Sequence, residues 1–179
     1  MARKMVECGM ALQSAIVIRH IFISPGHNFF GRHGQPAGTN PAVDVASVSC
    51  RAGRGLEGDR FFSYRPDYNG QVTFFSWEAY EDAKREFRVP HLAADAFRRN
   101  VIVEGVHLNE LIGSAFTLDG VEFQGVCEAR PCHWMNTVVA DGAEQWLRGR
   151  GGLRAKILSD GELHRGPVQL VSPGLLALG

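Results

Sequence analysis

Ala115-Phe-Thr-Leu-Asp-Gly-Val-Glu-Phe-Gln124 carries the clearest fold signal in the chain. Two short strand-like runs flank Asp119-Gly120, and Asp-Gly in this position is typical of a tight hairpin turn. A second Asp-Gly pair, Asp160-Gly161, joins a strand-like run at 154–158 to another at 162–164. This part of the chain is therefore predicted to consist of short strands connected by tight turns.

Further strand-like runs lie on both sides of this hairpin. Apolar and β-branched residues predict strands at 15–24, 43–50, 71–75, 100–104 and 168–171. Many short strands joined by Gly-bearing turns suggest a sheet that closes on itself. We therefore expect a mainly β fold, a closed or partly closed β-barrel. It should form a single domain over residues 15–172, with a lead-in at 1–14 and a tail at 173–179.

Two short helices are expected on the outside of this barrel. Ser76 can cap the first, which ends before Pro90. The apolar face of this helix consists of four residues: Trp77, Tyr80, Ala83 and Phe87. Asp141 can cap the second helix, with Glu144 three residues later completing a capping box.

Composition excludes several classes of protein. The chain has 179 residues, 45% of them hydrophobic and 21% charged, which is ordinary for a globular domain and unlike collagen, coiled coils or disordered chains. Its 19 basic and 19 acidic residues balance, so no overall charge attracts nucleic acid or an anionic membrane. No stretch approaches the roughly 20 apolar residues of a membrane span. Four irregularly spaced cysteines do not make a disulfide framework, so we expect reduced thiols in a cytoplasmic protein.

Two arginine-containing motifs are candidate anion sites. In the motif from Gly55 to Phe61, Gly58 lets the backbone approach a ligand closely, and Arg60 could hold an anion while Asp59 orients it. A polar turn with a local Asp–Arg pair is the alternative. Arg98-Arg99-Asn100 directly precedes a predicted strand. It could clamp an anion, or it could be a solvated helix end whose basic residues complement the helix dipole.

The third candidate is Arg130-Pro-Cys132-His133. Its basic side chains could favour the Cys132 thiolate, the form of cysteine that acts as nucleophile and metal ligand. Cys127 lies nearby in sequence, but no second cysteine pair accompanies it, so a structural zinc site is not expected. Cys8 and Cys50 have no such setting and are expected to be small apolar fillers.

A long surface loop is expected over the Gly- and Pro-rich residues 25–42. Loops of this length inside a compact domain are often functional, and we expect this one to border the candidate site. Its two histidines, His27 and His33, could be metal ligands, a proton relay or substrate contacts, or plain loop residues.

These motifs, taken in order, resemble the MOSC family, the domains related to the C-terminal part of molybdenum cofactor sulfurases. The resemblance runs from about residue 17 to residue 171 and is carried by the segments 55–60, 98–105, 130–132 and 151–158. It is nearest to the standalone bacterial, hydroxylaminopurine-resistance branch. The resemblance implies a strand-rich barrel like that of the pyruvate kinase barrel domain.

The resemblance also implies a pocket for the molybdenum cofactor, a molybdopterin. Cys132 would then be catalytic, either as a persulfide carrier or as a ligand of molybdenum, and a soft thiolate suits both roles. Cofactor binding is implied for eight residues: Gly58, Asp59, Arg60, Arg98, Arg99, Asn100, Arg130 and His33.

Three functions are compatible with this resemblance. The first is an enzyme, a molybdenum-dependent reductase of N-hydroxylated compounds that takes electrons from a protein partner. The second is a sulfur carrier that receives a Cys132 persulfide from a desulfurase partner. The third is a non-catalytic module that binds a pterin or another anion. Full sulfurases join the domain to a pyridoxal-phosphate desulfurase, for which this sequence has no room. No nucleic-acid or membrane partner is expected, and the oligomeric state is left open.

Overall fold

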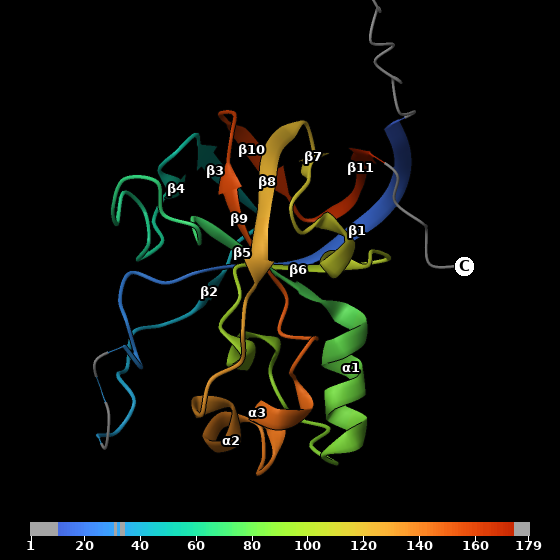
Figure 1. Ribbon diagram of the computed structural model, residues 1–179. Coiled ribbons are helices and arrows are strands. Elements are labelled where there is room, and N and C mark those ends of the chain that lie inside the picture. Colours follow the sequence, from blue (N-terminus) through green and yellow to red (C-terminus); the bar gives the residue numbers. More distant parts are fainter. Residues whose placement is uncertain (1–10, 31, 33–34, 174–179) are drawn as a thin grey trace, which may run out of the picture.

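Seven strands form a closed β-barrel, which confirms the predicted fold class. The computed structural model describes residues 11–30, 32 and 35–173. Around the barrel the strands follow the order β11, β7, β8, β9, β5, β6 and β1, and pairing of β1 with β11 closes the ring (Figure 1). Their bounds are β1 Ala11–Ile23, β5 Val72–Ser76, β6 Val101–Glu104, β7 Ala115–Leu118, β8 Val121–Glu128, β9 Leu153–Ile157 and β11 Gly166–Pro173.

Strand β1 starts at Ala11, four residues before the expected strand, and is long enough to pair with three others. Its neighbours are β11, β6 and the short edge strand β2 (Val43–Asp44). A separate sheet combines β10 (Gly161–His164), β3 (Ser47–Arg51) and β4 (Gly55–Leu56). All pairings are antiparallel except that of β5 with β6.

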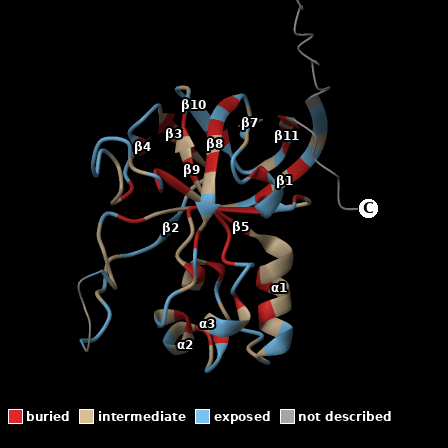
Figure 2. Ribbon diagram, in the orientation of Figure 1, coloured by how far each residue is buried: buried red, intermediate tan, exposed pale blue. Residues whose placement is uncertain are grey.

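Apolar residues from alternate strand positions fill the barrel. In β9, for example, Leu153, Ala155 and Ile157 are buried, whereas the residues between them are only partly covered (Figure 2). Three phenylalanines from different strands meet inside, with Phe123 lying 5.4 Å from both Phe74 and Phe116 between ring centroids. The interior is therefore a packed core.

The helices pack together below the barrel and form a second apolar cluster (Figure 1). They are α1 (Trp77–Glu86), α2 (Trp134–Val138) and α3 (Ala143–Trp146), with a 3-10 turn at Ala94–Phe97. A second 3-10 turn, Leu108–Leu111, packs its leucines into the barrel core. The predicted cap of α1 is confirmed, since the Ser76 side chain accepts a hydrogen bond from the Ala79 N–H. No helix in the described part of the chain is long and apolar enough to cross a membrane.

The hairpin at Asp119-Gly120 is confirmed. Both turn residues have positive φ, 50° for Asp119 and 79° for Gly120, and Leu118 pairs with Val121. Positive φ at both positions gives the turn the twist of its flanking strands. Asp160-Gly161 behaves differently, because β10 pairs with β3 and not with β9. The Asp160 carboxylate accepts a hydrogen bond from the Ala52 N–H, which joins this turn to the chain after β3.

Two further predicted elements differ from the structure. The single strand expected at 43–50 is divided into β2 and β3, because Val45 donates its backbone hydrogen bond to β1 while the Ala46 carbonyl accepts one from Arg165. Helix α3 starts after Gly142, whose φ is 83°, and has no side-chain cap, so the Asp141 capping box is wrong. The Asn136 side chain instead accepts the hydrogen bond of the Glu144 N–H. Helix α2 was not predicted.

Asn100, at the start of β6, connects the barrel to the loop after β4. It is buried, and its side-chain oxygen accepts hydrogen bonds from the Thr73 N–H (3.1 Å) and hydroxyl (2.8 Å). Its amide nitrogen donates to the Phe22 carbonyl (3.2 Å) and to the Asp59 carboxylate (3.2 Å). One side chain thus joins β1, β5 and β6 to the loop that contains Asp59.

We expect Asn100→Ala to lower the free energy of unfolding by about 3 kcal/mol, since each buried polar group left without a partner costs about 1–3 kcal/mol. Asn109→Ala is the matched control, because that amide is exposed and makes a single bond to the Gly149 carbonyl. Urea denaturation measures both variants. A loss below about 1 kcal/mol for Asn100→Ala would contradict this role.

Stability should also fall at alkaline pH through Cys50. Burial, together with the nearby carboxylates of Asp119, Asp160 and Glu162, raises the pKa of this thiol from 9.0 to about 12. The unfolded chain therefore loses the proton first, so stability is lost as the pH rises from about 9 to about 12. Relative to Cys50→Ala, the wild type should lose about 1.4 kcal/mol per pH unit in this range. An equal change in unfolding free energy between pH 9 and pH 10 for the wild type and Cys50→Ala would contradict this expectation.

Candidate functional site

Asp59 is the buried acceptor on which the site is built. It lies in the loop between β4 and β5 and is only 6% exposed. Its carboxylate accepts hydrogen bonds from the backbone N–H groups of Ser24 (3.3 Å) and Phe61 (3.0 Å), in addition to that of Asn100. It also pairs with the guanidinium of Arg60 at 3.2 Å. The carboxylate therefore fixes Arg60 against the end of β1.

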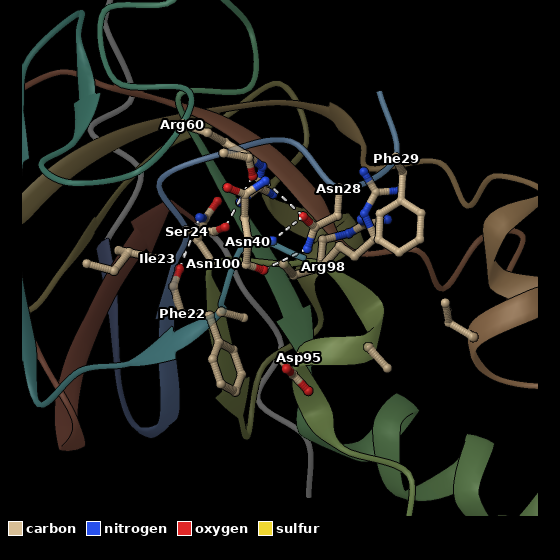
Figure 3. Close-up of a pocket in the computed structure, with 15 residues that line it drawn as sticks. Phe22, Ile23, Ser24, Asn28, Phe29, Asn40, Arg60, Asp95, Arg98 and Asn100 are labelled. Carbon is tan, nitrogen blue, oxygen red and sulfur yellow. Dashed lines mark hydrogen bonds between the residues drawn. The ribbon is translucent and has the colours of Figure 1, made fainter. Parts of the chain in front are cut away.

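Arg60 lines a cavity of about 190 Å³ at this end of the barrel. Figure 3 shows it facing this cavity together with Ser24, Asn100 and Arg98. The loop after β1 forms another wall, so the expectation that this loop borders the site is confirmed for its described residues. Two of its asparagines fasten it: Asn28 donates to the Asn40 carbonyl, and the Asn40 N–H donates to the Asn28 side chain, both at 2.8 Å.

Arg98 joins the cavity to the cysteine. Its backbone is left-handed, with φ 60°, which is uncommon for a residue with a side chain. The guanidinium lies 4.3 Å from the Phe29 ring centroid, and its Nη1 donates a hydrogen bond to Cys132 Sγ at 3.7 Å. Burial lowers the pKa of Arg98, while Cys132 acts in the opposite direction.

Cys132 lies on the exposed segment just before α2, outside the cavity wall. Phe29 contacts both Arg98 and Trp134, the first residue of α2, and so connects the loop after β1 to this segment. Among the other cysteines, Cys50 is buried as expected, whereas Cys127 is exposed. Cys8 lies outside the described residues.

Arg99 and Asn100 support the walls of the cavity. Arg99 donates to three backbone carbonyls, those of Phe97, Ala129 and Gly151. It therefore holds the segment leading to Cys132 against the turn before β9. Burial and the neighbouring Arg154 lower the pKa of Arg99 to about 10, so its guanidinium stays charged at neutral pH. The Asn100 side chain accepts two hydrogen bonds and donates two, all to other groups of the protein.

Gly58, Arg130 and His27 are not among the residues that line the cavity. Gly58 is exposed and has φ 83°, so it serves the turn before Asp59. Arg130 is exposed and does not line the cavity. His27 packs its ring on Phe61, with 4.9 Å between centroids, and burial and then Arg60 lower its pKa. His33 lies outside the described residues.

Sequence reasoning missed Phe29 and the pair Asn28 and Asn40. Each belongs to the loop expected at 25–42, in which only the two histidines were candidate site residues. The available signal was the placement of two asparagines 12 positions apart in a loop rich in Gly and Pro, since asparagine side chains readily bond to loop backbone.

Comparisons with known proteins identify the family and the fold. The family model of the MOSC domain matches residues 33–169. No curated protein sequence matches the chain. The solved structure of the YuaD protein from Bacillus subtilis is similar, with 17% identity and a TM-score of 0.71 over 92% of this chain and 99% of that chain.

Two YiiM structures are also similar. That from Escherichia coli has 19% identity and a TM-score of 0.61, covering 90% of this chain and 70% of that chain. That from Geobacillus stearothermophilus has 14% identity and a TM-score of 0.61, covering 92% and 75%. At these identities the likeness shows the fold, and membership rests on the family model. Because that model spans most of its length, the chain belongs to the MOSC domain family, which is associated with the molybdenum cofactor.

Proposed function

We propose that the cavity beside Arg60 and Arg98 binds the molybdenum cofactor, and that the protein is a reductase of N-hydroxylated compounds with Cys132 as the molybdenum ligand. The observation that carries the proposal is the 3.7 Å contact between Arg98, a residue of the cavity wall, and the Cys132 sulfur. It brings a cationic pocket and an exposed thiol together at one place.

The residues present fit such a cofactor. A guanidinium is a planar fork of five N–H donors that matches a phosphate group. Among the described residues, Arg60 directs one hydrogen bond to Asp59, and Arg98 directs one to Cys132. Both forks thus retain donors for an anionic group, and Arg60 and Arg98 would hold the phosphate of the pterin.

When bound, the cofactor supplies two-electron redox chemistry at molybdenum. Cys132 would supply a soft sulfur donor, and Arg98 donates a hydrogen bond to that sulfur. Arg99 keeps the segment before Cys132 in place through the Ala129 carbonyl. The Phe29 ring, 4.3 Å from the Arg98 guanidinium, helps to hold that side chain in place.

Cys132→Ser should abolish molybdenum retention, because a serine oxygen is a poor replacement for a soft thiolate. The thermal midpoint should stay within a few degrees of the wild type, since an exposed sulfur-to-oxygen change leaves no large cavity. The measurement is metal and pterin content after purification from a host that makes the cofactor.

Cys127→Ser is the matched control, as that thiol is also exposed and lies on β8, and it should retain the metal. Wild-type molybdenum content in the Cys132 variant would refute the ligand role.

A sulfur carrier is the second candidate, favoured by the exposure of Cys132 outside the cavity wall. In that reaction the Cys132 thiolate attacks the outer sulfur of a desulfurase persulfide. A new S–S bond forms on Cys132, and the desulfurase thiolate leaves, so no net oxidation occurs.

Incubation with a cysteine desulfurase and radiolabelled cysteine separates the two functions. A carrier should acquire label on Cys132, lose it in Cys132→Ser and keep it in Cys127→Ser. Metal retention without label excludes the carrier. Absence of both metal and label would leave a non-catalytic pterin- or anion-binding module.

A further inference from the structure

Five aromatic rings gather beside the cavity, on the loop between β4 and β5 and on the loop after β1. We call them the aromatic platform: His27, Phe30, Phe61, Tyr64 and Tyr68. Neighbouring rings have centroids between 4.9 and 6.4 Å apart, in tilted, edge-to-face and stacked arrangements. Each ring contacts at least one other, and Arg154 of β9 donates a hydrogen bond to the Tyr68 hydroxyl at 3.3 Å, which ties the platform to the barrel.

The outer members of the platform face solvent. Phe30 is 68% exposed and Tyr64 is 43% exposed. Single exposed apolar residues are ordinary, but these two rings are joined through the partly exposed His27, and such a continuous patch is of the kind that marks a binding surface. The patch is built from flat rings, which suits a flat partner more than an aliphatic one.

The charge beside the platform is positive. The Arg65 guanidinium lies 5.1 Å from the Tyr68 ring centroid and 6.0 Å from that of Tyr64. The nearest carboxylate in sequence, Asp67, pairs with Lys156. Arg65 itself has no carboxylate within salt-bridge distance among the described residues. A ligand that binds to the exposed part of these rings therefore meets an available cation that lies over Tyr64 and Tyr68.

The platform is continuous with the candidate site. Arg60, which lines the cavity, lies 5.2 Å from the Phe61 ring centroid. His27 contacts Phe61, and its pKa is lowered by burial, by Arg60 and by Arg98, so it lies within electrostatic reach of both arginines. A molecule on the platform therefore extends to the edge of the cavity.

We propose that the aromatic platform binds a planar aromatic ring that bears a phosphate, as in a mononucleotide, and thereby selects the substrate of the reductase. The identity of this molecule as a substrate rests on the proposed function, whereas its binding does not. The rings stack on the planar group, and Arg65 holds the phosphate. A simple anion would make no use of the rings, and a neutral ring would make no use of Arg65.

Titration of the purified apo-protein with adenosine 5′-monophosphate tests the proposal by calorimetry. Tyr64→Ala should weaken binding about tenfold, whereas Tyr64→Phe keeps the ring and should stay within about twofold, as expected for stacking. Arg65→Ala should weaken binding and remove the preference for adenosine 5′-monophosphate over adenosine. Arg85→Ala, an exposed arginine on α1 paired with Asp82, is the control and should bind like the wild type.

Several results would overturn the proposal. They are no binding at millimolar nucleotide, equal binding of ribose 5-phosphate, or unchanged affinity in Tyr64→Ala. Tighter binding of a short single-stranded oligonucleotide would overturn the mononucleotide assignment. The platform and the metal site are tested separately. Tyr64→Ala should retain molybdenum while losing nucleotide affinity, and Cys132→Ser should do the reverse.

Discussion

The buried hydrogen bond between Asn100 and Asp59 is the contact on which the site depends. A carboxylate that is 6% exposed must have several donors, and it finds them on β1, on its own loop, on Asn100 and on Arg60. The loop after β4 therefore cannot move without leaving a buried charge unpaired. Since this loop contains Arg60 and three rings of the aromatic platform, Phe61, Tyr64 and Tyr68, one buried pair helps to set the position of the cavity wall and of the surface beside it.

The adjacent residues Arg98 and Arg99 make different contacts because the backbone turns at Arg98. Arg98 has a left-handed conformation at the end of a 3-10 turn, and its side chain points to Phe29 and Cys132. Arg99 points the other way and bonds to three carbonyls. A left-handed non-glycine residue costs of order 1 kcal/mol or more, and such strain concentrates at functional sites. The same turn thus separates an arginine that contacts Phe29 and Cys132 from one that is bonded to three backbone carbonyls.

Several local signals in the sequence allowed prediction, although the equally local Asp141 capping box is wrong. The Asp119-Gly120 turn and the Ser76 cap depend on residues within a few positions, and both are confirmed. The parallel pairing of β5 with β6 and the partner of β10 depend on long-range register, which no local pattern specifies. For the same reason the motifs identified Arg98 and Arg99 together, but only the folded backbone distinguishes them.

The arrangement divides the site into rigid and exposed parts. Asp59, Asn100 and Arg99 are tied to barrel backbone, so changes to them act through folding as well as through binding. Cys132, Tyr64 and Arg65 are exposed, so packing constrains their side chains less than it constrains buried ones. Substitutions at these exposed residues are therefore expected to cost little stability. Loops mounted on a rigid barrel commonly carry binding residues for this physical reason.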